Sequence, residues 1–285
     1  MTPKVYFTNF CTTGGETLPQ KLARLLLSAG MDQIDFKDKY VAIKIHFGEL
    51  GNMAYLRPGY ARVVVDLIKD LGGKPFLTDA NTMYVGSRKN ALDHLETVAS
   101  WGVRLINPVW NNANVLSGSC ADEPDRGLSV YGREFVAKMY EYGIFADVSH
   151  ISDAGFWDVI QAAKGPVVAS HSNARAPGLC PHRRNLTDDM FRAVRDTGGV
   201  VGINLYLDFV GGGHMDDLIA HIEHFLSLSG ESTVAIGGDL DGCEALAAGM
   251  TGVQDVAKLY QALEERGYPQ SLLEDIFWNN WRRIL

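Results

Sequence analysis

Ile144-Phe-Ala-Asp-Val-Ser-His150 and Pro166-Val-Val-Ala-Ser-His171 are two short apolar runs, and each ends in Ser-His. Between them, residues 152–164 carry apolar side chains at helical spacing, and Ser152 is placed to cap the helix N-terminus. Strand, helix and strand in this order form a right-handed crossover, which makes the strands parallel and puts both histidines at one end of the sheet. Because sites in α/β folds are built at that end, the pair is a candidate metal site. The alternative is that the histidines only form hydrogen bonds at strand ends.

The composition is that of an ordinary globular protein. The 285 residues are 46% hydrophobic and 21% charged, enough for one large α/β domain or two medium ones. A net charge of −8 argues against nucleic acid as a partner, since a basic patch is expected in such proteins. No run is long enough to span a membrane, the N-terminus lacks the apolar core of a signal peptide, and the four cysteines are scattered. These features predict no membrane partner and a cytoplasmic location.

Strand and helix patterns alternate along the whole chain. The expected strands are residues 4–8, 40–46, 75–79, 103–107, 144–148, 166–170, 199–205 and 233–239. Alternation of this kind gives a parallel sheet, and eight units in a chain of this length predict an α/β fold with a closed (β/α)8 barrel of the TIM type. Three of these units belong to the N-terminal part of the chain and five to the C-terminal part.

Polar side chains stand at the C-terminal ends of the expected strands. They are Asn9, His46, Asp79, Trp110, His150, His171, Asn204 and Asp239. In a barrel these positions converge on one mouth, so one shared site is favoured over eight unrelated strand ends.

Several motifs in the C-terminal part resemble those of one enzyme family. They are Trp110-Asn-Asn-Ala-Asn, Ala121-Asp-Glu-Pro-Asp-Arg-Gly, Asp147-Val-Ser-His-Ile-Ser-Asp, Ala169-Ser-His-Ser-Asn, Cys180-Pro-His-Arg-Arg-Asn-Leu-Thr and Ile236-Gly-Gly-Asp-Leu-Asp-Gly. Over residues 99–285 the chain thus resembles the membrane (renal-type) dipeptidases, which are zinc-dependent and barrel-shaped. This resemblance is specific, because several separate motifs occur in the same order as in the family.

The resemblance implies a role for the histidines and for one carboxylate. His150 and His171 match the two histidines that bind zinc in the family. Asp239 matches the aspartate that handles protons and the substrate amine.

The same resemblance assigns substrate-binding residues. Arg184 matches the arginine that holds the substrate carboxylate, although Arg183 is an alternative because the loop before it is about two residues longer than usual. Trp110 stands where some members carry a histidine that stabilises the tetrahedral intermediate, and Asn204 is assigned to the substrate as well.

Residues 1–97 resemble a different, uncharacterised prokaryotic family, often associated with ferredoxin-type domains. The matching stretches are Val41-Ala-Ile-Lys-Ile-His-Phe-Gly-Glu, Gly73-Lys-Pro-Phe-Leu-Thr-Asp-Ala-Asn-Thr and Gly86-Ser-Arg-Lys-Asn-Ala-Leu-Asp-His. No ferredoxin cysteine cluster is present, so no iron–sulfur centre is expected. The chain therefore looks like a chimera of residues 1–97 and 98–285, which could still form one continuous barrel over residues 1–285. The alternative is a small three-layer α/β module packed on an incomplete barrel.

The first-strand His-x-Asp ligands of the dipeptidases are missing, and Phe7-Thr-Asn9 stands there instead. Asp79 ends the expected third strand, where the family has a bridging carboxylate, and His46 ends the second. These two residues could complete a site for one or two zinc ions. The alternative is that Asp79 caps a turn and His46 is structural.

These inferences lead to two functional hypotheses. The first is a zinc-dependent, dipeptidase-like hydrolase that acts on small dipeptides, impaired by the missing first-strand ligands. The second is a non-catalytic α/β scaffold or binding protein. A homodimer is compatible with either hypothesis.

Overall fold

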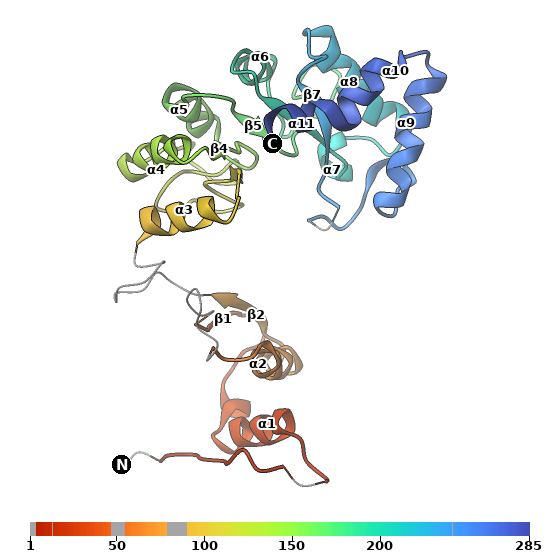
Figure 1. Cartoon of the computed structure of the whole chain (residues 1–285). Coiled ribbons are helices and arrows are strands. Elements are labelled where there is room, and N and C mark those ends of the chain that lie inside the picture. The colour runs from red at the N-terminus through yellow and green to blue at the C-terminus, as the bar shows by residue number, and fades with distance from the viewer. Residues whose placement is uncertain (1–3, 13, 47–54, 79–89, 241) are drawn as a thin grey trace. The chain divides into compact units, whose positions relative to one another are not determined.

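The computed structural model describes residues 4–12, 14–46, 55–78, 90–240 and 242–285 (Figure 1). The chain divides into two compact units, Met1–His94 and Leu95–Leu285. The division falls inside helix α3 (Ala91–Ser100), whose Leu95 side chain belongs to the buried core of the second unit.

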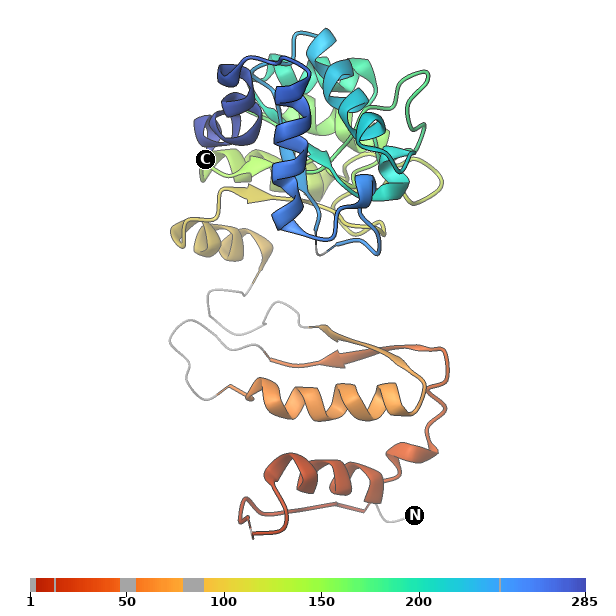
Figure 2. The ribbon, with the colours of Figure 1, turned by 90° about the vertical axis from the view of Figure 1, so that its right-hand side faces the viewer.

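The first unit contains a parallel strand–helix–strand element. Strands β1 (Tyr40–Lys44) and β2 (Lys74–Thr78) pair in parallel, and α2 (Pro58–Asp70) connects them. Before them come α1 (Leu18–Ser28) and the short 3-10 helix η1 (Met31–Gln33). Figure 2 shows α2 lying between the two strands and α1, and both neighbours contact it. The helix therefore covers one face of the sheet.

The strand expected at residues 4–8 is wrong. The described part of this segment is irregular and pairs with no strand, and the side chains of Val5 and Phe7 are 91% and 83% exposed. An alternating apolar pattern gives a strand only where a neighbouring strand accepts its backbone hydrogen bonds. The described residues therefore hold seven strands, two in the first unit and five in the second.

The second unit contains the five strands expected for the C-terminal part. They are β3 (Leu105–Ile106), β4 (Phe145–Ala146), β5 (Val168–Ala169), β6 (Val200–Asn204) and β7 (Val234–Gly238). All pairings are parallel, β3 with β4 and β5 with β6 with β7. A parallel bridge between Asp147 and Val168 links the two groups. Sequential neighbours are therefore adjacent in space, as in a barrel.

Helices separate these strands along the chain. They are α4 (Val130–Glu141), α5 (Asp153–Ala162), α6 (Asp188–Asp196), α7 (Leu207–Val210), α8 (Met215–Ser227), η2 (Ala247–Gly249), η3 (Val253–Asp255), α9 (Val256–Glu265), α10 (Gln270–Glu274), the π-helical turn η4 (Asp275–Asn279) and α11 (Asn280–Ile284). The expected cap of α5 is confirmed, because the Ser152 hydroxyl accepts a hydrogen bond from Gly155 N at 3.0 Å. Among the described residues, no helix has both the length and the apolar character needed to cross a bilayer.

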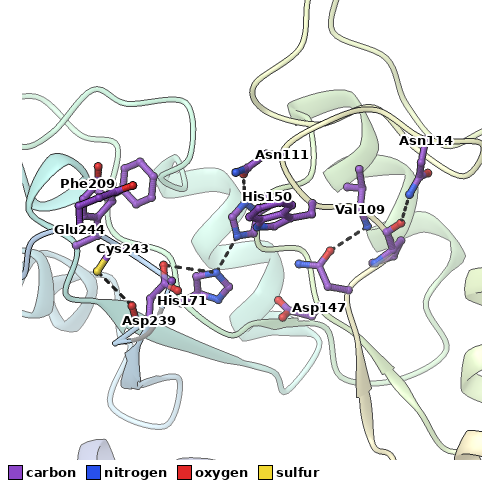
Figure 3. A pocket seen from close by; sticks show the side chains of 15 residues that line it. Val109, Asn111, Asn114, Asp147, His150, His171, Phe209, Asp239, Cys243 and Glu244 are labelled. Carbon is purple, nitrogen blue, oxygen red and sulfur yellow. Dashed lines mark hydrogen bonds and ion pairs between the residues drawn. The ribbon is translucent and has the colours of Figure 1, made fainter. Parts of the chain in front are cut away.

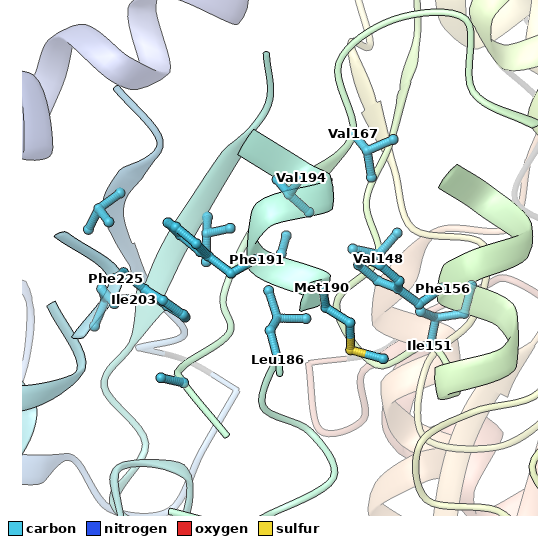
Figure 4. Packing of buried hydrophobic residues seen from close by; sticks show 14 of the residues in the cluster. Val148, Ile151, Phe156, Val167, Leu186, Met190, Phe191, Val194, Ile203 and Phe225 are labelled. Carbon is cyan, nitrogen blue, oxygen red and sulfur yellow. The ribbon is translucent and has the colours of Figure 1, made fainter. Parts of the chain in front are cut away.

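One continuous core joins the strands and helices of the second unit (Figure 4). Phe191 of α6 and Phe225 of α8 stack with ring centroids 4.1 Å apart, and Phe156 of α5 is buried in the same cluster. Burying each such ring is worth about 1.5–3 kcal/mol relative to leaving it exposed. The packed helices therefore hold the strand ends in place.

Backbone segments of strands β5, β6 and β7 approach each other closely in this unit. A side chain added at Gly202 or at Gly237 would place its Cβ 2.1 Å from the carbonyl oxygen of Ser170. Only glycine allows strands β5, β6 and β7 to lie this close at that level.

His221 on α8 is fully buried. Its Nδ1 accepts from Ala174 N at 3.2 Å, and its Nε2 therefore donates to Val210 O at 2.9 Å. Both ring nitrogens are satisfied in the neutral form, and burial lowers the pKa of this histidine.

The neutral His221 makes stability depend on pH. In the unfolded chain His221 takes up a proton as the pH falls below the ordinary histidine pKa of 6.5, whereas in the folded chain it does so only at lower pH. The free energy of unfolding should therefore decrease from pH 6.5 towards pH 5. Because other groups titrate too, urea unfolding should compare wild type with His221→Gln, in which this decrease should be smaller. His224→Gln on the same helix is the matched control, and parallel pH curves for wild type and His221→Gln would contradict the prediction.

Candidate metal centre and active site

A cavity of about 970 Å³ opens at the C-terminal ends of the strands in the second unit (Figure 3). Its lining residues are Asn107, Pro108, Val109, Trp110, Asn111, Asn114, Asp147, His150, His171, Tyr206, Phe209, Asp239, Gly242, Cys243 and Glu244. The structure thus brings four of the predicted site residues into one cavity, namely Trp110, His150, His171 and Asp239.

The two histidines meet through their Nε2 atoms, which lie 2.9 Å apart. His150 Nδ1 lies 2.9 Å from the side-chain oxygen of Asn111, which can only accept, so this Nδ1 carries the proton. His171 Nδ1 lies 2.7 Å from the hydroxyl of Ser170. That hydroxyl donates its proton to Asp147, so it accepts from His171 Nδ1. Both Nε2 atoms are therefore left with lone pairs that face each other.

This arrangement fits a cation and no ordinary hydrogen bond. Burial, the charge of Arg184 and the neighbouring His171 together lower the pKa of His150 to about 3. Burial and Arg184 also lower the pKa of His171. Both rings are neutral at physiological pH, which is the form of imidazole that binds metal ions. Among the described residues, no group of three or more His, Cys, Asp or Glu side chains is placed so that it could hold a metal ion. These residues thus supply half of a tetrahedral site.

His150 and Asp239 both have left-handed backbone conformations, with φ of 71° and 61°. Non-glycine residues rarely adopt this conformation, and it costs about 1–2 kcal/mol. Each of the two residues follows the end of a strand, β4 and β7, and each points its side chain into the cavity. Strained backbone of this kind is typical of functional sites.

Asp239 lies beside the histidine pair and is held by a neighbour. Its Oδ2 is 3.9 Å from His171 Nε2 and accepts from the side-chain amide of Asn204 at 3.1 Å. Asn204 is fully buried and does not line the cavity, and its amide also reaches the carbonyl of His171 at 3.4 Å. In this structure Asn204 therefore holds Asp239 and does not itself face the cavity.

Arg184 lies below the cavity wall and is only 4% exposed. One guanidinium nitrogen donates to Ser172 Oγ at 2.7 Å, whereas Nε and Nη2 have no partner among the described residues. The Phe209 ring, which lines the cavity, lies 5.7 Å from the guanidinium carbon. Arg183 instead forms an ion pair with Glu123 at the surface. A buried cation with two unpaired donors is suited to an anionic ligand, because unpaired buried donors are costly.

Trp110 forms part of the outer wall of the cavity. Its side chain is 68% exposed, and its ring centroid lies 6.3 Å from that of His150. The ring can therefore contact a ligand without touching the ion site.

The two surrogate ligands are not tested by this geometry. His46 lies in the first unit, directly after β1, and Asp79 lies outside the described residues. Their assignment stays a prediction. Sequence reasoning missed Asn111, Asp147 and Ser170, although each stands inside a motif that was recognised by its histidine or tryptophan.

Comparison with known proteins identifies the family. Residues 84–285 match the membrane dipeptidases, peptidase family M19, which is more than half of the chain. The chain belongs to this family. The M19 match confirms the predicted resemblance and, at the level of the family, an enzyme of the hydrolase class. Residues 41–115 separately match a domain of unknown function, DUF362, which confirms a second resemblance in the N-terminal part.

Relatives of this M19 member include named dipeptidases. An uncharacterized protein of Klebsiella pneumoniae is 38% identical over 204 residues, which cover 67% of this chain and 74% of that protein. An uncharacterized dipeptidase of Schizosaccharomyces pombe is 36% identical over 56% of this chain and 39% of its own length. The dipeptidase aclJ of Aspergillus oryzae is 34% identical over 65% of this chain and 45% of its own length. The chain thus spans less than half of these two fungal relatives.

Solved structures support the fold. A metallo peptidase from Rhodobacter sphaeroides, bound to a phosphinate mimic of the dipeptide L-Ala-D-Ala, gives a TM-score of 0.63 at 25% identity over 93% of this chain and 71% of that one. The dipeptidase AC, another M19 metallo peptidase, gives 0.63 at 25% identity over 92% and 74%. These neighbours confirm an α/β fold of the TIM-barrel type.

The left-handed backbone at His150 predicts an unusual stability result. His150→Gly should be as stable as wild type or up to about 1 kcal/mol more stable, because glycine adopts this conformation without strain. His171, whose φ is not positive, should lose about 1 kcal/mol when replaced by glycine. Chemical denaturation in the presence of a chelator would measure both. Equal losses in the two variants would show that the backbone at His150 is not strained.

Proposed function

We propose that this protein is a zinc-dependent hydrolase that cleaves the peptide bond of dipeptides in the cavity of its second unit. The observation that carries this proposal is the pair of neutral imidazoles whose Nε2 lone pairs face each other, with Asp239 beside them. Family membership supplies the substrate class, because the relatives named above include dipeptidases.

His150 and His171 would hold the ion through Nε2. A bound zinc supplies a polarised carbonyl and a water of lowered pKa. The protein's own contribution begins with keeping both rings neutral and fixed by their Nδ1 hydrogen bonds. Their positions do not change as the substrate enters, because strands and buried helices hold them.

Asp239 is placed to move a proton between the nucleophile and the leaving amine. Its carboxylate faces the histidine pair, and the Asn204 amide holds one of its oxygens. Because Asn204 is itself held by Asn173, whose side-chain oxygen accepts from Asn204 N at 2.9 Å, the carboxylate keeps one orientation. This positioning favours proton transfer in a fixed direction.

Arg184 would recognise the substrate carboxylate. Its two unpaired nitrogens would gain charge-assisted hydrogen bonds, and the Phe209 ring between it and the cavity would have to yield to the ligand. Trp110 would form the outer wall against a substrate side chain, since it is exposed and lies beside His150.

A half site should bind metal weakly unless other residues complete it. We propose that Asp79 and His46 complete the site. We also propose that the chain is a chimera of the two matched families, joined near residue 97. The strand-end positions of Asp79 and His46 in the sequence support the first proposal, and the overlap of the two family matches between residues 84 and 115 supports the second.

Hydrolysis of Ala-Ala dipeptides in added zinc tests the proposal. Wild type should release free alanine, and His171→Ala should lose at least about a hundredfold in kcat/KM, because one of the two proposed ligands is gone. Ser227→Ala, an exposed position on α8, is the matched control and should behave as wild type. The zinc content of Asp79→Ala, measured in parallel, should fall if that residue is a ligand. A wild-type chain that retains no zinc and cleaves no dipeptide would favour the scaffold hypothesis.

A pair of arginine variants separates the two candidates for carboxylate recognition. Arg184→Lys should lower kcat/KM by about 10- to 100-fold, since the loss of bidentate hydrogen bonds to a charged group costs roughly 1.5–3 kcal/mol. Arg183→Lys should stay within about threefold, because its ion pair with Glu123 lies at the surface. Steady-state kinetics of both variants would decide, and the reverse ranking would assign Arg183 instead.

A further inference from the structure

A buried carboxylate, that of Asp147, is linked to His171 through the Ser170 hydroxyl without touching either histidine ring. Asp147 is 7% exposed, and its Oδ1 accepts from the backbone N–H groups of Ser149 and Ser170, each at 3.0 Å. Its Oδ2 accepts from the Ser170 hydroxyl. All three of these donors are fixed by the backbone of two neighbouring strand ends.

The direction of the Ser170 hydrogen bond follows from this arrangement. A hydroxyl has one proton, and the carboxylate has none to give. If the hydroxyl turned towards His171, two oxygens with lone pairs would be left in close contact. The proton therefore points to Asp147, and the Ser170 oxygen accepts from His171 Nδ1 at 2.7 Å.

We propose that Asp147, acting through Ser170, is a positioning residue that fixes His171 in the tautomer with its proton on Nδ1. The consequence is that the His171 Nε2 lone pair faces that of His150, which keeps the space between them open to a cation and closed to a shared proton. This inference deepens the proposed zinc-dependent function and rests on it for its purpose. The tautomer itself can be read without any metal.

His150 is oriented by a hydrogen bond that is more easily replaced. Its partner Asn111 is exposed, so a water molecule can replace the lost oxygen when Asn111 is truncated. Ser170 is half-buried and Asp147 is buried, which leaves little room for such a replacement. The two histidines should therefore respond differently to the loss of their partners.

Asp147→Asn provides a test that changes few atoms. The two backbone N–H groups at Oδ1 require an oxygen at that position, so the new amide nitrogen must take the place of Oδ2. It then donates to Ser170, whose hydroxyl turns to donate to His171 Nδ1. His171 must carry its proton on Nε2, from which it donates to His150 Nε2 and closes the metal position.

The experiment reads the tautomer by ¹⁵N NMR of the imidazoles in the metal-free full chain. Wild type and Asp189→Asn, an exposed control, should show His171 protonated on Nδ1. Asp147→Asn should show it protonated on Nε2. If Asp147→Asn keeps the wild-type tautomer, or if wild type already carries the proton on Nε2, the inference is overturned. Circular dichroism and the melting temperature establish that each variant is folded.

Zinc titration of the same samples gives a second readout. Zinc affinity should fall by about 10- to 100-fold in Ser170→Ala, by at least as much in Asp147→Asn, and by less than about fivefold in Asn111→Ala. Equal losses of zinc affinity in Ser170→Ala and Asn111→Ala would contradict the expectation that Ser170 orients its histidine more firmly than Asn111 does. A wild-type chain that binds no zinc would contradict the proposed function, while the spectra of the metal-free samples still decide the tautomer.

Discussion

Two imidazole nitrogens that both carry lone pairs, held 2.9 Å apart, are the contact on which the rest of this site depends. Two like lone pairs at that distance repel each other, so the surrounding structure must hold them together. The link between β4 and β5 does so through the parallel bridge from Asp147 to Val168. The same bridge brings Asp147 next to Ser170, so the element that forces the contact also sets its proton arrangement.

Charge near this pair comes mainly from a buried cation. Burial and, after it, the charge of Arg184 lower the pKa of both histidines, although Arg184 contacts neither ring in the described structure. It is neutralised only in part by Asp147 and Asp239, which both act to raise its own pKa while burial lowers it. One guanidinium thus acts on the metal ligands and offers unpaired donors to an anion. Binding of an anionic group to Arg184 would therefore be felt electrostatically by the histidines.

The sequence correctly predicted the features of the site that depend on regular secondary structure. The meeting of His150 and His171 follows from a strand–helix–strand crossover, and the cap at Ser152 follows from a local pattern. The sequence-based prediction failed where contacts between distant parts of the chain determine the structure. The segment at residues 4–8 has a strand pattern but finds no partner strand among the described residues. The tautomers depend on hydroxyl and amide groups from separate loops, whose hydrogen-bond directions no spacing reveals. Asp79 and His46 remain predictions, because Asp79 lies outside the described residues and His46 lies in the other unit.

The glycine pair beneath the cavity has a consequence for how this site can evolve. Gly202 and Gly237 both lie against the Ser170 carbonyl, so a methyl group at either one must push the end of β5 away. Such a change would displace Ser170 and His171 together while every polar residue of the site remained. A homologue could therefore lose its metal through a mutation in apolar backbone packing. The metal-binding residues of such a homologue would all still be present in its sequence. Inferring activity in related chains therefore requires checking these two glycines as well as the histidines.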